Sequence, residues 1–401
     1  EGELDVLEGV SSLVEKSLLR QEEDAAGEPR FVMLETIHEY ARAKLEESTE
    51  VQEVDRRHAE FFLALAEEAF AGLVGPAQGR WLSRLEVEHD NLRAALRRTL
   101  EHGEAELAGR LAGSLWRFWS ARGHVREGRQ WLREVLSTDG VSPPTRAKGL
   151  YGAGVLARWQ GDLTAAESLT EEGLSLSRQL EDARGIAGAL TNLGILLVKR
   201  GDLARAEVFL EEAAVRWREL GDKGYVAVAL YHLATIAVER QEYTRAESLC
   251  QECLVLAQEA ANPSAAVVPH VVLGDLARRR GDLRRALTHL REGLRLAREA
   301  GNVQYATNCL AYLAQAIGES GERERAARLF GAAEARFAAL GTRVEGPAVK
   351  EYDSTLAAAR AQPDNAAWER LFQEGAAMAF EEAITCALEE EPGGGDPAGQ
   401  A

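Results

Sequence analysis

Apolar residues recur three or four positions apart along most of this chain, which is the spacing of one face of an α-helix. Leu190, Leu193 and Leu197 form one such stripe, and another begins at Leu203 after a short Gly-Asp turn. The polar residues between them would face solvent. The pattern therefore predicts pairs of amphipathic helices that are joined by tight turns.

These helix pairs repeat with a constant period. The stretches GDLTAAESLTEEGL, GDLARAEVFLEEAA, QEYTRAESLCQECL, GDLRRALTHLREGL and GERERAARLFGAAE begin at positions 161, 201, 241, 281 and 321. Each carries an alanine at the same place: Ala166, Ala206, Ala246, Ala286 and Ala326. Small residues such as Gly194 are expected where helix axes approach closely. One hairpin cannot bury its apolar face alone, so we expect neighbouring hairpins to stack into an all-α superhelix.

The segments around this array suggest further divisions of the chain. Residues 1–48 predict a helix end, a two-stranded hairpin and a helix, and residues 49–142 predict less regular amphipathic helices. The regular 40-residue repeats span 143–341. Residues 342–390 are expected to form helices that cap the last repeat, and the Gly-rich segment 391–401 is expected to be a flexible tail.

The charge balance restricts the partners of this chain. Lys and Arg total 47 against 65 Asp and Glu, a net charge of -18. Such a surface repels phosphates and anionic lipid, so neither nucleic acid nor a membrane is an expected partner. Because the sequence lacks a run of about 18 apolar residues and begins with acidic residues, we expect a cytoplasmic location.

No pattern of a catalytic or metal site stands out. The eight histidines are scattered, and neither G-x-S-x-G nor H-E-x-x-H occurs. Cys250 and Cys253 form a C-x-x-C pair, but they align with Leu210 and Ala213 of the preceding repeat and are expected to pack in the core. We therefore predict no catalytic, cofactor-binding or metal-binding residue, and no enzyme activity.

The repeats resemble a known family. The spacing from Leu193-Gly194 through Gly201-Asp202 to Ala206 is similar to the tetratricopeptide repeat (TPR), whose usual period is about 34 residues. The longer period of this chain resembles that of the repeats in bacterial regulators related to the maltose activator. The resemblance implies a right-handed superhelix in which the first helix of each hairpin lines a concave groove.

A second resemblance covers the start of the chain. The segments LVEKSLL, RFVMLETIHEYA, RRHAEFF and LEVEHDNLRAAL resemble the winged-helix end of signal-transduction ATPases with numerous domains (STAND), in LuxR-type and antibiotic-regulator-like members. The chain is thus expected to start inside the last subdomain of a larger switch protein. The resemblance implies ATP or ADP in an upstream ATPase module. No GxxxxGK[ST] loop occurs in this chain, for which no cofactor is predicted.

Two details of this winged-helix remnant lead to expectations. Plant relatives carry a Met-His-Asp motif where Met33, Leu34 and Glu35 stand, and Leu34 lacks the polar contact that the histidine would make. Residues 1–48 hold 13 acidic and 5 basic residues, so DNA binding is not expected. Instead, the face that bears Tyr40 is expected to be buried against later helices.

Ligand-binding residues are expected on the inner face of the repeats. Transferring the groove positions from one repeat to the next gives a set of aromatic, hydrogen-bonding and cationic side chains: Tyr151, Arg158, Asn192, Lys199, Tyr231, His232, Asp275, Arg278, Tyr312 and Gln315. Such a groove would suit a peptide, a protein or a small anionic effector. A merely solvated groove is equally compatible with these residues. Trp116 and Trp119 could alternatively form an upstream pocket, although core packing is the simpler interpretation.

Taken with the resemblance, these residues suggest an effector-sensing and protein-interaction array of a STAND-type bacterial transcriptional regulator. Ligand binding on the repeats would control the ATPase switch. A free-standing TPR adaptor scaffold is the alternative.

Overall fold

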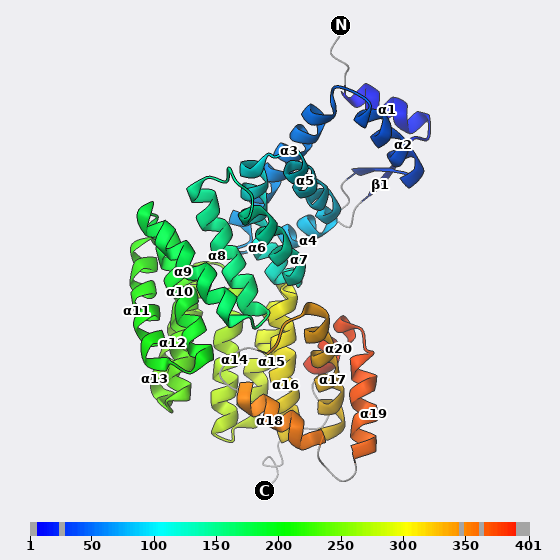
Figure 1. Cartoon of the computed structure of the whole chain (residues 1–401). Helices are drawn as coiled ribbons and strands as arrows, with labels where there is room; N and C mark the ends of the chain where they lie inside the picture. Colours follow the sequence, from blue (N-terminus) through cyan, green and yellow to red (C-terminus); the bar gives the residue numbers. More distant parts are fainter. Residues whose placement is uncertain (1–5, 24–28, 345–348, 361–364, 390–401) are drawn as a thin grey trace. The chain divides into compact units, whose positions relative to one another are not determined.

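Twenty α-helices and one β-hairpin make up the part of the chain that the computed structural model describes, which comprises residues 6–23, 29–344, 349–360 and 365–389 (Figure 1). The all-α fold class is therefore confirmed. The chain divides into two compact units, Glu1–Glu60 and Phe61–Ala401. None of the described helices is both long and apolar enough to cross a membrane.

The first unit contains the predicted hairpin between helices. Its elements are α1 (Val6–Glu15), β1 (Leu19–Glu23), β2 (Pro29–Met33), α2 (Glu35–Glu46) and the beginning of α3 (Val51–Gly72). The strands are antiparallel, and Leu19 pairs with Met33. The predicted turn between them, at 24–28, lies outside the described residues.

A buried ion pair links α2 to the start of α3. Arg42 donates to both carboxylate oxygens of Asp55, at 2.7 and 3.1 Å, and Asp55 is 1% exposed. Tyr40, in contrast, is 65% exposed, so the prediction that its ring is buried is wrong. Position 40 lies on the polar side of α2, while Arg42 makes the contact to α3.

The second unit begins with irregular helices and continues into the regular array. The irregular helices are α4 (Gln78–Val87), α5 (His89–Glu101), α6 (Ala105–Arg122) and α7 (Val125–Leu136). The array consists of α8 (Pro143–Trp159), α9 (Leu163–Gln179), α10 (Ala183–Arg200), α11 (Leu203–Glu219), α12 (Lys223–Glu239), α13 (Tyr243–Glu259), α14 (Pro263–Arg279), α15 (Leu283–Glu299), α16 (Val303–Glu319) and α17 (Arg323–Leu340). First and second helices alternate at the period that the sequence pattern predicts.

The turns recur at half this period. A residue with positive φ follows the end of each array helix: Gly161, Glu181, Gly201, Gly221, Gln241, Ala261, Gly281, Gly301, Gly321 and Gly341. Most are glycine, which adopts this left-handed conformation at little cost. The next residue is often Asp or Asn, and its side chain caps the new helix. Asp202 accepts from the Arg205 N–H, and Asn302 accepts from the Tyr305 N–H.

Small residues set the distance between the two helices of a hairpin. A Cβ atom placed on Gly194 would lie 2.6 Å from Leu210 Cγ, and one on Gly274 would lie 2.7 Å from Leu290 Cγ. Cys250 and Cys253 are fully buried free thiols in this interior, which confirms that they are packing residues. Burial raises the pKa of the Cys250 thiol to about 12 and so keeps it protonated.

Three helices follow the array: α18 (Val349–Arg360), α19 (Asn365–Ala376) and α20 (Phe380–Leu388). Their apolar residues join a cluster with α16 and α17, which includes Phe330, Tyr352, Phe372 and Ile384. A Cβ on Gly331 would meet the Phe372 carbonyl, so α19 packs directly against the backbone of α17. The predicted tail, 391–401, lies outside the described residues.

The array curves so far that its later repeats contact the irregular helices. Helix α16 packs against α6, and Ser264 on α14 donates a hydrogen bond to Gln78 on α4. A Cβ on Gly123 would lie 2.0 Å from Leu340 Cδ2 at the end of α17. Neighbouring first helices contact one another along the array: α8 with α10, α10 with α12, α12 with α14, and α14 with α16. This curvature encloses the space that the first helices line.

Candidate functional site

A cavity with two adjoining chambers lies among the first helices of the hairpins. The smaller chamber has a volume of about 190 Å³ and is lined from α4, α6, α8, α10, α12, α14 and α16. The larger has a volume of about 960 Å³ and extends toward α17 and α18. Five residues line both chambers: Arg158, Trp159, Ile195, Tyr231 and Tyr305. The chambers are therefore parts of one concave site.

Arg117 is one of two arginines in the smaller chamber. Its guanidinium donates to the Phe70 carbonyl oxygen and to the Tyr225 hydroxyl, each at 2.7 Å. It also lies 3.9 Å from the centre of the Phe70 ring. Aromatic rings and neutral acceptors thus hold this cation in place without neutralising its charge.

Arg158, the second arginine, is fixed by a chain of buried polar groups. Its Nε donates to Asn192 Oδ1 at 3.0 Å, and Asn192 Nδ2 donates to Thr170 Oγ1 at 2.8 Å. Thr170 in turn donates to the Ala166 carbonyl oxygen at 2.6 Å. Successive hairpins supply these residues, so the array itself determines where Arg158 points.

Aromatic rings form much of the remaining wall. Trp116 and Tyr151 meet edge to face with centroids 5.4 Å apart, and Tyr225 stacks on Trp217 at 4.3 Å. The indole Nε1 of Trp116 is buried and has no hydrogen-bond partner among the described residues. Burial, followed by the neighbouring Tyr225, raises the pKa of Tyr151 well above its usual value, so its hydroxyl stays protonated. Flat rings and neutral donors therefore accompany the two arginines.

The charge of the smaller chamber is opposite to that of the chain. No Asp or Glu occurs among the described residues that line it. Lys148 lies behind the Phe70 ring, with its Nζ 4.2 Å from the ring centre. Burial lowers its pKa to about 8, and nearby Arg117 acts in the same direction, although Glu67 opposes the shift. In the larger chamber the charges are mixed: Lys199, Arg200 and Arg343 occur with Glu239, Glu334 and Asp353.

His232 borders the larger chamber beside these cations. Burial, and then the charges of Arg158 and Lys199, lower its pKa well below the usual value. The imidazole is therefore neutral at pH 7 and can donate or accept a hydrogen bond. Its Nε2 is buried without a hydrogen-bond partner among the described residues.

The structure brings six of the ten sequence-predicted groove residues to this cavity. These are Tyr151, Arg158, Asn192, Lys199, Tyr231 and His232. Their role in binding stays a prediction. Trp116 also lines the smaller chamber, whereas Phe118 and Trp119 are core residues with 0% and 1% exposure.

The other four predicted residues, Asp275, Arg278, Tyr312 and Gln315, do not line either chamber. Asp275, Tyr312 and Gln315 are each 1% exposed. Arg278 donates to Asp275 at 2.8 Å and to Glu319 at 2.9 Å, so its charge is already compensated. These positions match the groove register, but the last repeats are covered by α18. For example, Gln315 lies 3.4 Å from Thr355 of that helix.

Sequence reasoning missed Arg117, Tyr225 and Tyr305. Tyr225 and Tyr305 occupy the same position in two first helices of the array, and this recurrence of an aromatic residue was the available signal. Arg117 comes from an irregular helix that the repeat register does not include. Its place in the cavity depends on the curvature of the array.

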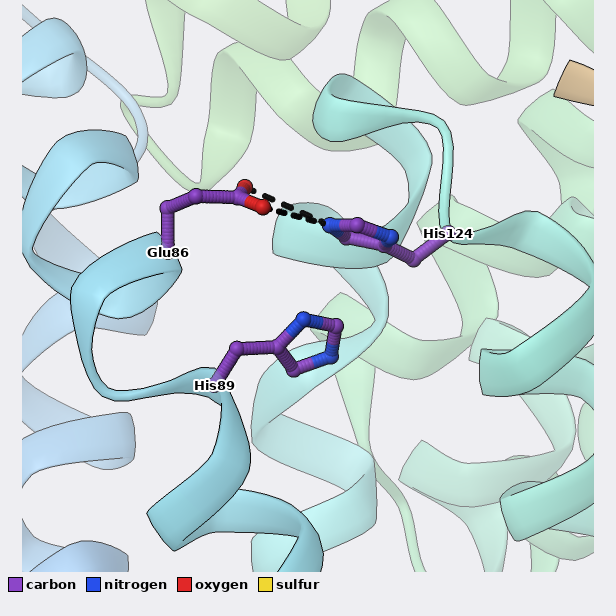
Figure 2. A group of neighbouring side chains, drawn as sticks. All are labelled: Glu86, His89 and His124. Atoms are coloured by element: carbon purple, nitrogen blue, oxygen red, sulfur yellow. Dashed lines mark hydrogen bonds and ion pairs between the residues drawn. The ribbon is translucent and has the colours of Figure 1, made fainter. Parts of the chain in front are cut away.

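A second group of polar side chains lies outside the cavity. Glu86, His89 and His124 place one potential metal-ligating atom each within 4.8 Å of one another, and Figure 2 shows all three side chains converging. His124 Nε2 is 3.0 Å from Glu86 Oε1. This arrangement was not predicted, because the two histidines are far apart in sequence.

Comparison with known proteins identifies the array. A family model described as the MalT-like TPR region matches residues 154–377, more than half of the chain. The chain belongs to the MalT-like TPR family. A second model, described as a winged helix-turn-helix domain, matches residues 1–46 of this MalT-like TPR protein. The predicted TPR array and the predicted winged-helix segment are therefore confirmed.

Relatives of this MalT-like TPR protein include three mycobacterial proteins. They are named as candidate HTH-type transcriptional regulators and come from Mycobacterium bovis and two strains of Mycobacterium tuberculosis. Each is 34% identical over 198 residues, which are 46% of this chain and 22% of the relative. The matched segment thus spans about a fifth of each relative.

Solved structures with a similar fold share less sequence identity with this chain. A STAND protein with a TPR sensor from Pyrococcus horikoshii has a TM-score of 0.47 at 17% identity, covering 91% of this chain and 59% of that one. NprR in complex with its cognate peptide NprX has a TM-score of 0.48 at 17% identity, covering 76% and 94%. Scores of this size support no inference about ligands.

Proposed function

We propose that this chain is the effector-sensing region of a STAND-type transcriptional regulator, and that its concave cavity binds a ligand with an anionic group on an apolar or aromatic body. One observation carries the proposal. In a chain with a net charge of -18, two arginines point into a small chamber whose described lining includes no acidic residue.

Arginine is well suited to recognise such a group. The guanidinium can donate two parallel hydrogen bonds to a carboxylate, phosphate or sulfonate. Arg117 approaches the chamber from α6 and donates to two neutral oxygens, so it is the arginine on which the proposal rests. Arg158 adds positive charge from α8. Nearby rings of Trp116, Tyr151 and Tyr225 offer apolar surface for the rest of the ligand.

The larger chamber suits the remainder of an extended ligand. Its volume of about 960 Å³ is at the upper end of the range for small-molecule sites, about 300–1,000 Å³. The mixed charges of this chamber would accept polar groups of either sign. A small anionic effector and a peptide that presents a carboxylate share this chemistry.

Binding at this place would act on the regulator through the curvature of the array. A ligand that contacts α6, α8 and α12 together binds the closed arrangement better than any arrangement in which they separate. It would therefore shift the population toward the closed form, to the extent that the two affinities differ. In the proposed regulator, this shift would be read by an ATP- or ADP-dependent module.

The proposal can be tested with two dyes that share an apolar body and differ in charge. 8-Anilinonaphthalene-1-sulfonate carries a sulfonate, and N-phenyl-1-naphthylamine lacks it. Fluorescence titration of the 401-residue chain should show tighter binding of the sulfonate. Arg117→Met should weaken its binding about 10-fold or more, the usual effect of losing a charged hydrogen bond, and change the affinity for the uncharged dye far less.

Two variants make the test specific. Arg117→Lys keeps the charge and should restore part of the affinity for the sulfonate. Arg205→Met removes an exposed arginine outside the cavity and should change neither dye. Equal binding of the two dyes by the wild type would refute the proposal and favour a plain scaffold. Equal loss of both dyes in a variant with an unchanged melting curve would do the same.

A further inference from the structure

Three helix ends converge where Glu86, His89 and His124 meet. Glu86 is the penultimate residue of α4, His89 is the first residue of α5, and His124 is the N-cap of α7. His124 Nε2 lies 3.0 and 3.3 Å from the two Glu86 oxygens. The centres of the two imidazole rings are 4.3 Å apart. Figure 2 shows the carboxylate and one ring facing each other, with the His89 ring beside them.

A carboxylate lies beside His89 on the side away from Glu86. The Nε2 of this histidine lies 3.2 Å from Glu127 Oε1, and Arg93 donates to the same carboxylate at 2.5 and 2.7 Å. Metal-binding histidines commonly direct one ring nitrogen to a carboxylate and the other to the metal. His89 Nε2 is buried beside Glu127 and makes no hydrogen bond among the described residues, so the ring is not held by that carboxylate. Its other nitrogen, Nδ1, can face a metal, and Figure 2 shows a ring nitrogen on the side toward Glu86.

We propose that Glu86, His89 and His124 bind a divalent transition-metal ion of the Zn²⁺ type. Two imidazoles and a carboxylate match the donors that Zn²⁺ takes at about 2.0–2.2 Å. In a tetrahedral site such donors are about 3.3 Å apart, and the Glu86–His124 separation of 3.0 Å is already close to this value. Glu86 is partly exposed, so solvent can supply the fourth ligand.

One neighbouring group opposes the cation. Arg122 Nε lies 3.7 Å from Glu86 Oε2, and its positive charge would repel a metal bound there. If the cluster binds a metal, removing Arg122 should strengthen the binding. If Glu86 and Arg122 form only a structural ion pair, removing Arg122 should loosen the fold and have no such effect.

The experiment is a titration of the EDTA-treated 401-residue chain with Zn²⁺ by calorimetry, and with Co²⁺ by visible absorption. We expect one equivalent to bind with micromolar or better affinity, and Co²⁺ to show the strong d–d bands of tetrahedral coordination. His124→Ala and Glu86→Gln should each weaken binding at least 10-fold, and Arg122→Gln should tighten it severalfold.

Other histidines provide the controls. His38 is exposed and outside the cluster, and His270 pairs with His289 elsewhere in the array. Replacing His38 or His270 by Ala should leave the affinity of the proposed site unchanged. A dissociation constant for Zn²⁺ weaker than about 100 micromolar would overturn the proposal, and so would equal affinities of the wild type and His124→Ala. So would a loss of affinity in His270→Ala that matches the loss in His124→Ala.

Discussion

Arg117 donates a hydrogen bond of 2.7 Å to the hydroxyl of Tyr225, a residue 108 positions later in the chain. This bond joins an irregular helix, α6, to the third hairpin of the array across the smaller chamber. Tyr225 is held in turn by stacking on Trp217, at a centroid distance of 4.3 Å and an interplanar angle of 14°. The position of the arginine therefore depends on the array being closed.

Removing only the Tyr225 hydroxyl should loosen the orientation of Arg117 without changing its charge. Tyr225→Phe keeps the stacked ring but takes one acceptor from Arg117. We expect a loss of about 0.5–1.5 kcal/mol in stability, as for one hydrogen bond, and a few-fold weaker binding of anilinonaphthalene sulfonate. Denaturant unfolding and dye titration would measure the two effects. Tyr243→Phe, outside the cavity, should change neither.

Gly194 tests the spacing within a hairpin. A Cβ there would lie 2.6 Å from Leu210 Cγ, so Gly194→Ala must displace a buried side chain. We expect destabilisation of about 1–3 kcal/mol, the usual cost of overpacking. Gly113→Ala in α6 places its Cβ 3.6 Å from the nearest atom and should instead be neutral or stabilise by up to about 1 kcal/mol. Denaturation midpoints that shift in the same direction would contradict this account.

The hairpins could be predicted from sequence because each rests on local signals. Apolar spacing, the residue of positive φ and the Asp or Asn cap all lie close together in the sequence and recur along the array, as at Gly201 and Asp202. The alignment of positions also brought Arg158 and Asn192 into one site, because equivalent positions in stacked first helices become neighbours.

The closure of the array could not be predicted in this way. The curvature of the array is the sum of small rotations between successive hairpins, and no single residue indicates how large that sum is. Arg117 was missed for this reason, since its bond to Tyr225 of α12 requires the curvature that also brings α16 against α6. The expectation that Tyr312 and Gln315 line the groove was wrong for a related reason. They keep the groove register but are covered by α18, which belongs to no repeat.

The corrected view of the first unit gives a contrasting pair of variants. Tyr40 is 65% exposed, so Tyr40→Ala should change stability by no more than about 0.5 kcal/mol. Asp55→Asn should cost about 2–4 kcal/mol, because it leaves Arg42 without its buried partner. Proteolysis or hydrogen exchange of residues 6–60 would compare them. A Tyr40→Ala effect as large as that of Asp55→Asn would restore the original prediction of a buried ring.

Ion pairs repeat along the array with the same period as the hairpins. Arg200 with Glu167, Arg240 with Glu207 and Arg280 with Glu247 all join neighbouring hairpins at 2.6 Å. The side chains are partly exposed, so each pair should contribute only about 0.2–1 kcal/mol. A double-mutant cycle on Arg240→Ala and Glu207→Gln should give this coupling energy, and 1 M NaCl should reduce it. A coupling that does not depend on salt would show that packing holds the hairpins together here.

His270 contributes to the dependence of the array's stability on pH. Burial, and then the neighbouring His289, lower its pKa from 6.5 to about 4, and the two Nδ1 atoms are 3.2 Å apart. The folded state keeps this imidazole neutral, while the unfolded chain takes up a proton near pH 6.5. Its contribution to stability is therefore complete above about pH 6.5 and is lost as the pH falls toward 4.

The side chain is partly exposed, so we expect this loss to be about 1–2 kcal/mol. His270→Gln should flatten the curve of unfolding free energy against pH by that amount between pH 6.5 and 4, and leave its shape above pH 7 unaltered. His38→Gln, at an exposed site, should give a curve parallel to that of the wild type. If the His270→Gln curve is also parallel, the acid sensitivity of the array comes from other groups, which include His232, His289 and the carboxylates of the ion pairs between hairpins.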